Sequence, residues 1–104
     1  MLVAIVEKDR VAVKRETGTT VRLMMQKGVL SANISPDESL LAVTIADYGV
    51  KIFKGPGFTS TTKMFLYKDI TDARWSTNDT IALTRKGFTE LRNVKTGAVI
   101  RTIR

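Results

Sequence analysis

The stretch ANISPDESLLAVTIADYGVKIFK (residues 32–54) decides the fold class of this chain. It alternates short apolar runs with two groups of turn-forming residues, Ser-Pro-Asp at 35–37 and Asp-Tyr-Gly at 47–49. Pro presets φ at the second position of a turn, Gly accepts a positive φ, and Asp bonds back to nearby backbone. β-branched residues are frequent in the apolar runs, as is typical of strands. The stretch therefore predicts three short strands joined by tight turns.

The same pattern continues over the whole chain. Turn-forming residues separate eleven apolar runs, and no window of about a dozen residues carries a 3.6-residue apolar stripe free of turn signals. The predicted strands are 2–7, 10–16, 20–26, 29–35, 40–46, 49–54, 62–68, 70–76, 80–86, 88–94 and 97–104. We therefore predict an all-β chain essentially without helix.

The turns recur with a period near 40 residues. ANISPDESLLAV (32–43) aligns with ARWSTNDTIAL (73–83) at a spacing of 41 residues, and ETGTTVRLM (16–24) aligns with KTGAVIRTI (95–103) at a spacing of 79. Four short strands in about 40 residues form the repeat of a β-propeller blade. A two-sheet β-sandwich would use the same strands but would leave this period unexplained.

The ordered motifs resemble those of WD40-type propeller repeats. In that family an inner strand ends in Ser-Pro-Asp-Gly, a Leu-Ala-rich second strand and an Asp-Gly turn follow, and a third strand ends in Trp-Asp before Thr-Gly and an outer strand. This chain offers ISPDESLLAV, ADYGVKIFK, WSTNDTIALT, FTELRNVKTG and VIRTIR at those places. The resemblance implies antiparallel four-stranded blades at 29–69 and 70–104, preceded at 1–28 by three strands of a partial blade. The ring would then be incomplete within one chain.

The chain departs from the family pattern in its polar residues. It contains no His, and Trp-Asp is replaced, for example by Phe53-Lys54 and by Arg92-Asn93. The family's buried hydrogen-bonded tetrad therefore cannot form in its usual chemistry, and Asp47 is its one matching acidic member. We expect the blades to depend on apolar packing instead. The residues expected in this packing are Ile34, Leu41, Val43, Val50, Ile52, Trp75, Ile81, Leu83 and Leu91.

The absence of His and Cys removes most catalytic constellations. A Ser-His-Asp triad, a Cys-His pair and a His/Cys zinc site all require one of them. The carboxylate pairs Asp69 with Asp72 and Asp37 with Glu38 lie at predicted turns, where Asp caps local backbone. The segment GPGFTSTTK (55–63) lacks the spacing of a phosphate-binding loop and is expected to be a long loop. We therefore expect no enzymatic activity, no metal site and no cofactor.

The formal net charge is +7 over 104 residues, and it is unevenly distributed. Residues 1–27 carry six basic and three acidic groups, residues 28–69 four and four, and residues 70–104 seven and three. Such a charge speeds association with acidic partners. The chain has no apolar stretch long enough to span a membrane, no recognisable secretory leader and no Cys. We therefore expect a cytoplasmic location and no membrane association.

The resemblance also implies which turns lie together. In the family, the turns from outer to next inner strand share one rim with the turns from second to third strand. Carried over position by position, the candidate partner-binding residues on this rim are Lys8, Arg10, Lys27, Tyr48, Lys68, Arg85 and Lys86. A Tyr among cations can anchor a protein partner or stack on a base.

We predict a non-catalytic protein-binding or scaffold module that completes its propeller by self-association or with another chain. An open array exposes an apolar blade face and unpaired strand edges, which is the reason to expect such completion. The alternative is a basic nucleic-acid-binding subunit of an RNA–protein assembly. The two differ in salt dependence, because phosphate contacts weaken steeply as salt rises.

Overall fold

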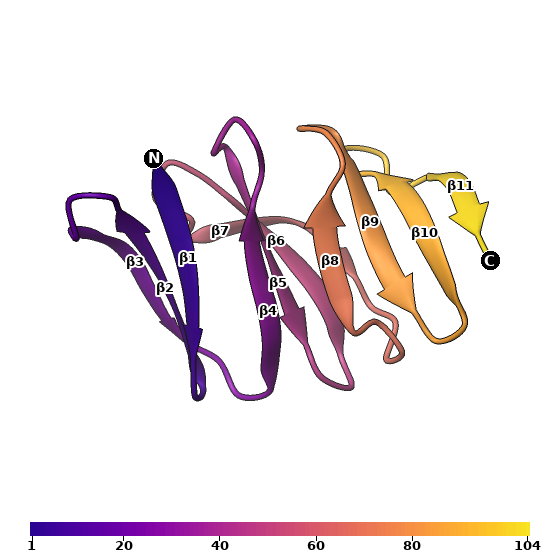
Figure 1. Cartoon of the computed structure of the whole chain (residues 1–104), viewed down its shortest axis with the longest axis horizontal. Helices are drawn as coiled ribbons and strands as arrows, with labels where there is room; N and C mark the ends of the chain where they lie inside the picture. The colour runs from indigo at the N-terminus through magenta and orange to yellow at the C-terminus, as the bar shows by residue number, and fades with distance from the viewer.

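A computed structural model describes all residues 1–104 as eleven strands in three antiparallel sheets (Figure 1). The first sheet contains β1 (Leu2–Glu7), β2 (Arg10–Arg15) and β3 (Thr20–Met25). The second sheet contains β4 (Val29–Ile34), β5 (Leu40–Ile45), β6 (Gly49–Lys54) and β7 (Ser60–Phe65). The third sheet contains β8 (Asp72–Trp75), β9 (Thr80–Arg85), β10 (Phe88–Asn93) and β11 (Val99–Ile103). No helix is long and apolar enough to cross a membrane.

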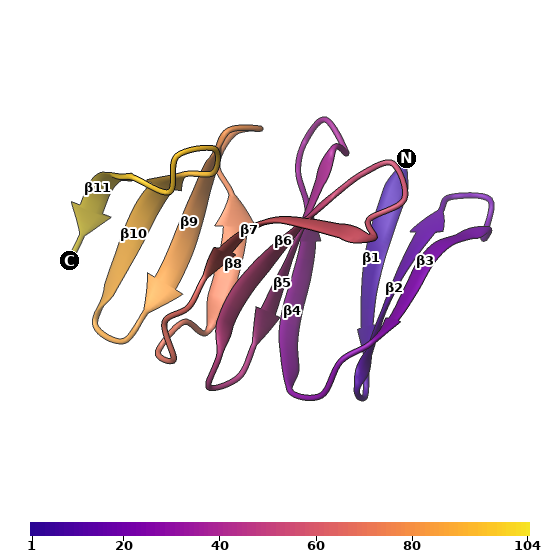
Figure 2. The ribbon, with the colours of Figure 1, turned by 180° about the vertical axis from the view of Figure 1, so that it is seen from behind.

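The three sheets follow one another in a row, with the N-terminus at the first sheet and the C-terminus at the third (Figures 1 and 2). Within each sheet every strand pairs with the next strand along the chain. Connections therefore alternate between two opposite edges of the row, at the top and the bottom of Figure 1. This order brings turns from all three sheets together on each edge.

Strand direction distinguishes the first sheet from the other two. β4 and β8 run in the same direction, since Ser31 bonds to Asp72 and Asn33 bonds to Ala73 farther along both strands. β1 also lies beside β4 but runs the opposite way, and its first backbone N–H reaches the turn that follows β4. β1 therefore runs in the same direction as β5 and β9, the second strands of the other two sheets. The first sheet has no counterpart of β4 and β8.

Two apolar clusters lie between the sheets. Side chains alternate across a strand, so neighbouring residues of β5 enter different clusters. Leu41 packs toward the first sheet with Val13, whereas Ala42 packs toward the third sheet with Leu83. β5 is consequently buried on both faces, which explains its continuous apolar sequence. The two clusters contain sixteen buried residues, seven in the first and nine in the second.

The residues expected in the packing divide into three groups. Six are buried: Leu41, Val43, Val50, Ile52, Ile81 and Leu83. Ile34 and Trp75 are partly buried and pack against the clusters. The expectation for Leu91 was wrong, because Leu91 belongs to neither cluster. It pairs with Ala82, on the face of the third sheet that points away from the second.

All eleven predicted strands are present, with differences at their ends. The strand expected at 62–68 is β7, and it begins earlier because Ser60 already pairs with Lys54 across a bulge. It ends earlier because Tyr67 accepts a backbone hydrogen bond from Ile70 at 3.2 Å, which forms a turn. The same turn delays the following strand, expected at 70–76, to Asp72–Trp75.

The segment between β6 and β7 is more than the long loop that was expected. Gly55 donates its backbone N–H to Ser39 at 2.8 Å, and Phe58 donates to Lys54 at 3.1 Å. These bonds fold the segment back, and the Phe58 side chain is fully buried in the cluster between the first and second sheets. Phe58 has a φ of 56°, a conformation rare for a bulky residue. Nothing in the local sequence predicts this buried position.

Candidate interaction surfaces

The Ser-Pro-Asp stretch builds a turn and links two sheets. Asp37 Oδ1 accepts hydrogen bonds from the Ser35 hydroxyl at 2.9 Å and from the backbone and hydroxyl of Ser39 at 3.0 and 2.6 Å. Led by the bonds from Ser39, these donors hold the pKa of Asp37 below its ordinary value. The Asp37 backbone N–H donates to Asn78 Oδ1 of the third sheet at 2.7 Å. The motif therefore has a structural role at a junction between sheets.

A second set of polar contacts joins the second and third sheets along β4 and β8. The Ser31 hydroxyl donates to Asp72 Oδ1 at 2.8 Å, and Asn33 Nδ2 donates to the Ala73 carbonyl at 2.8 Å. Trp75 Nε1 donates to the Asn33 carbonyl at 2.9 Å. These bonds fix the register of one sheet against the next, which apolar packing alone does not do.

A charged network joins the third sheet to the segment between β7 and β8. Arg85 donates to Glu90 Oε1 at 3.0 Å and to Asp69 Oδ1 at 2.9 Å. Arg92 donates to the same Glu90 oxygen at 3.0 Å. The guanidinium carbons of Arg85 and Arg92 lie 4.2 and 5.2 Å from the centre of the Tyr67 ring. We call this set the Arg85–Glu90–Arg92 network.

The network is electrically balanced and nearly buried. Glu90 is 8% exposed. Burial alone would raise the pKa of Glu90, but hydrogen bonds from Arg85 and Arg92 outweigh it and leave that pKa below its ordinary value. A hydrogen bond from Arg85 likewise lowers the pKa of Asp69. All four groups are therefore charged near neutral pH, and the charges cancel in pairs.

This network was not predicted from the sequence, although a signal was present. Residues 88, 90 and 92 must share one face of a strand, because side chains alternate. The packing expected at Leu91 put Glu90 and Arg92 on the opposite face, so the buried side of this strand was assigned the wrong way round. Arg92 also stands at the position where the family pattern has Trp. The polar contacts of this blade therefore differ from those of the family pattern.

Four predicted lysines lie along one edge of the row. The β1–β2, β3–β4, β7–β8 and β9–β10 connections lie at the bottom of Figure 1 and carry Lys8, Lys27, Lys68 and Lys86 respectively. All four are exposed. None takes part in an ion pair. We call this set, together with Tyr48 of the β5–β6 turn, the basic turn edge.

The other predicted rim residues have partners within the chain. Tyr48 is 38% exposed, with its hydroxyl 3.8 Å from Met64 Sδ and its ring 5.3 Å from the Lys51 ammonium. Arg10 forms an exposed ion pair with Glu7. Arg85 points inward to its network, and its side chain is only 16% exposed. Of the predicted rim residues, the lysines and one face of Tyr48 are therefore the ones that are accessible and without a partner in the chain.

The remaining acidic residues of interest lie apart from one another. Asp47 is exposed in its turn with a φ of 57° and makes no side-chain hydrogen bond, so it is not part of a buried tetrad. Asp69 bonds to Arg85, whereas Asp72 bonds to Ser31 and Arg74. No group of three or more His, Cys, Asp or Glu side chains is arranged to hold a metal ion.

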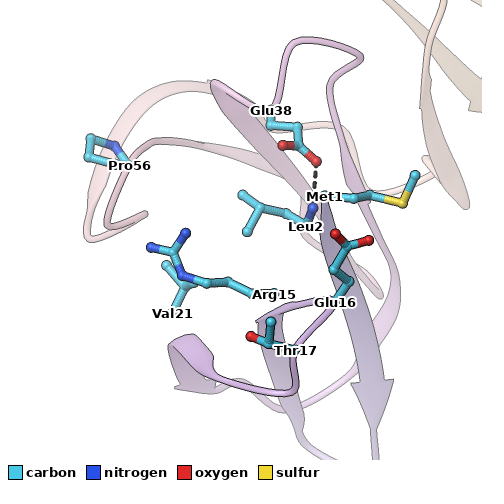
Figure 3. Close-up of a pocket in the computed structure, with 8 residues that line it drawn as sticks. All are labelled: Met1, Leu2, Arg15, Glu16, Thr17, Val21, Glu38 and Pro56. Carbon is cyan, nitrogen blue, oxygen red and sulfur yellow. Dashed lines mark hydrogen bonds between the residues drawn. The ribbon is translucent and has the colours of Figure 1, made fainter.

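A cavity of about 400 Å³ lies where the first sheet meets the second (Figure 3). Its lining residues are Met1, Leu2, Arg15, Glu16, Thr17, Val21, Glu38 and Pro56. The backbone N–H of Leu2 donates to the carboxylate of Glu38 at its margin. The Arg15 guanidinium points away from Glu38 (Figure 3). The cavity is mixed in polarity and open to solvent, and it contains no convergent set of catalytic groups.

The chain is similar to known proteins in structure but not in sequence. No protein-family model and no curated protein sequence matches the chain. A chain in the crystal structure of the mitotic checkpoint complex is similar, with a TM-score of 0.78, 18% identity, and coverage of 97% of this chain and 34% of that one. KlHsv2 with loop 6CD replaced by a Gly-Ser linker is similar, with a TM-score of 0.64, 17% identity, and coverage of 97% and 41%.

The chain thus spans between a third and about two fifths of the length of these two structures. At such low identity the likeness concerns the fold. Its three consecutive antiparallel sheets superpose on a part of each propeller over nearly the whole chain. The chain therefore has the fold of a segment of a WD40-type β-propeller.

Proposed function

We propose that the chain is a non-catalytic protein-binding scaffold module that binds an acidic partner on its basic turn edge. We also propose that copies of itself or another chain complete its propeller. The basic turn edge carries the first part of the proposal. It gathers four exposed lysines without ion pairs and one half-exposed tyrosine from separate turns of the three sheets.

The chemistry of this edge suits an acidic peptide or protein surface. Unpaired lysines attract carboxylates and raise association rates. Tyr48 supplies an aromatic surface of the kind that anchors protein interfaces. The similar chain of the mitotic checkpoint complex belongs to a multiprotein assembly, which supports a partner of the protein class.

A binding experiment tests the proposal with two probes. The first is a labelled acidic peptide containing one tryptophan, and the second is labelled oligouridylate, each titrated with the chain and followed by fluorescence anisotropy. We expect saturable binding of the peptide. The double variant Lys27→Gln/Lys86→Gln should weaken it at least about fivefold, because the variant removes two charges of the basic turn edge.

The matched control is Lys54→Gln/Lys95→Gln, which removes the same net charge from the opposite edge of the row. Equal weakening by both variants would mean that only net charge matters and would refute a site on the basic turn edge. Tight binding of the oligonucleotide with a steep loss between about 50 and about 300 mM NaCl would favour the nucleic-acid function instead.

A further inference from the structure

The first sheet has an uncovered apolar face. Val11 and Val13 of β2 point toward the second sheet, so the alternate residues of the first sheet point outward. Ile5 and Leu23 pair with Ala12 from either side, and all three lie on this outward side. The first-sheet outer face consists of the apolar residues Val3, Ile5, Ala12, Leu23 and Met25, with Lys14 beside Val3 and Arg10 beside Met25 on the same side. Of the apolar residues, all but Ala12 are exposed, and Met25 reaches 74%.

The third sheet has an uncovered face at the other end of the row. Ile81 and Leu83 point toward the second sheet, so the residues between and beside them point away from it. Leu91 pairs with Ala82, which places both on this outward side. The third-sheet outer face consists of Ala82, Thr84, Thr89, Leu91 and Ile103, and it also carries Arg74 beside Ala82 and Arg101 beside Leu91. No other part of the chain covers it (Figure 2).

The chain itself shows what the third-sheet outer face accepts. In the second sheet Ala42 pairs with Ile52 and Val50 pairs with Phe65, and these four residues are buried against the third sheet. In the third sheet the same pattern recurs one blade later. Ala82 pairs with Leu91, and Thr89 pairs with Ile103. The third-sheet outer face therefore corresponds to the face of the second sheet against which the third sheet packs.

The first-sheet outer face corresponds to the other side of such an interface, which is the side that a sheet presents to the sheet before it. Leu41 and Val43 of β5 are buried against the preceding sheet. Val3 and Ile5 occupy the corresponding places on β1, which runs in the same direction as β5 and like it begins a hairpin across the basic turn edge. The two uncovered faces are thus the two complementary halves of one repeating interface.

We propose that two copies of this chain close head to tail, with the first-sheet outer face of each packed on the third-sheet outer face of the other. The inference rests on the scaffold function and names the copy that completes the propeller. Propellers have about four to eight blades. Two copies of a three-sheet chain supply a number of sheets within that range, and three copies exceed it.

Charge sets the salt dependence of this dimer. Each copy carries a net charge of +7, so the two repel at low ionic strength. Salt screens this repulsion and strengthens apolar contact, so raising NaCl from about 50 to about 500 mM should tighten the dimer. Nucleic-acid binding would respond to salt in the opposite direction.

The first test is the mass of the purified chain in solution, measured by sedimentation and light scattering. The expected mass is twice the 11.5 kDa of one chain. A monodisperse monomer at both salt concentrations would overturn the inference. If that monomer still bound the acidic peptide on its basic turn edge, the binding function would stand without the dimer, so the two failures are distinguishable.

The second test uses complementary variants. Ile5→Glu damages the first-sheet outer face, and Leu91→Glu damages the third-sheet outer face. Each variant alone should dimerise at least about tenfold more weakly. An equimolar mixture should form a heterodimer, because one intact interface remains between the two variants. Leu66→Glu, at a residue 57% exposed outside both faces, is the matched control and should dimerise like the parent chain.

Failure of the mixture to associate, with both variants folded by circular dichroism, would refute the head-to-tail arrangement. If the charged variants do not fold, cysteine cross-linking replaces them, since the chain contains no Cys. Oxidised Ile5→Cys/Leu91→Cys should give a covalent dimer closed by two disulfides. Cross-linking of Ile5→Cys alone would instead indicate pairing of like faces and overturn the inference.

Discussion

Replacing Glu90 with Gln removes the charge that holds the Arg85–Glu90–Arg92 network together while keeping the shape of the side chain. Oε1 of Glu90 accepts hydrogen bonds from Arg85 and Arg92, both at 3.0 Å. After the substitution Arg85 keeps Asp69 as its ionic partner. Arg92 keeps only neutral acceptors, the Gly97 carbonyl and the hydroxyl oxygen of a tyrosine. The variant therefore leaves one nearly buried guanidinium without a counter-ion.

Removing one partner of a buried ion pair costs about 3–5 kcal/mol. The lower end applies here, because the side chains of Arg85 and Arg92 remain 16% and 12% exposed and one of them keeps a carboxylate. We expect Glu90→Gln to lower the free energy of unfolding at pH 7 by about 3 kcal/mol. For a domain of this size that corresponds to a fall in Tm of more than about 10 °C.

The assay is urea denaturation at fixed protein concentration, followed by the fluorescence of the single tryptophan. Urea is uncharged and does not screen ion pairs. The control is Glu16→Gln, since Glu16 is exposed and forms no ion pair. It should change the free energy of unfolding by less than about 0.5 kcal/mol.

The pH dependence gives a second, independent readout. The pKa of Glu90 in the folded chain lies below its ordinary value, so its ionised form stabilises the folded state above the unfolded pKa of about 4.3. That stabilisation is lost as pH falls through the folded pKa. The difference between the parent chain and Glu90→Gln should therefore shrink below about pH 4. A difference under about 1 kcal/mol at pH 7, or one unchanged down to pH 3, would refute the reasoning.

Three further substitutions test the packing between and within sheets. Phe58→Ala should lower the free energy of unfolding by about 3–5 kcal/mol, because it empties a fully buried site. Urea denaturation measures this change. A loss under about 1 kcal/mol would show that the Phe58 side chain contributes little to the core. Gly49→Ala and Gly18→Ala both place a Cβ at a positive φ, 136° and 95° respectively, but only the Cβ at Gly49 lies 2.0 Å from a backbone oxygen of β7, whereas that at Gly18 meets nothing within 4 Å. Gly49→Ala should therefore lower Tm far more than Gly18→Ala, and equal effects would contradict the close approach. Trp75→Phe removes the hydrogen bond to the Asn33 carbonyl at 2.9 Å and should lower the free energy of unfolding by about 1 kcal/mol. Thermal unfolding followed by circular dichroism measures this change. An unchanged stability would show that the hydrogen bond is dispensable.

Local sequence predicted the strands well because each turn carries its own chemistry. Ser-Pro-Asp at 35–37 and Asp-Tyr-Gly at 47–49 mark turns through φ preferences and side-chain bonds that need no distant partner. The period near 40 residues then indicated blades, and the structural comparison confirms a WD40-type fold. The ends of β7 and β8 were misplaced because a bulge and the turn at Tyr67 set them.

Features that depend on contacts between distant residues were not predictable in the same way. In the sequence Phe58 looks like a residue of a glycine-rich loop. It is buried only because its segment folds back, so that Phe58 packs with residues of the first and second sheets. Arg85 was expected on the basic rim because the family resemblance places its turn there, yet it points inward to Asp69 and Glu90. Whether such a cation faces solvent or a carboxylate depends on residues from another part of the chain.

The pairing of every strand with its neighbour along the chain has a consequence for the order of folding. Each sheet needs only loop closures of a few residues, and such local contacts form quickly. Contacts between sheets join residues about 40 positions apart and must form later. During synthesis strand pairing within a sheet can therefore begin before the next sheet exists, whereas its apolar face is covered only after the neighbouring sheet has formed. Pulse-labelled hydrogen exchange should show protection within β4–β6 before the Trp75 indole N–H is protected.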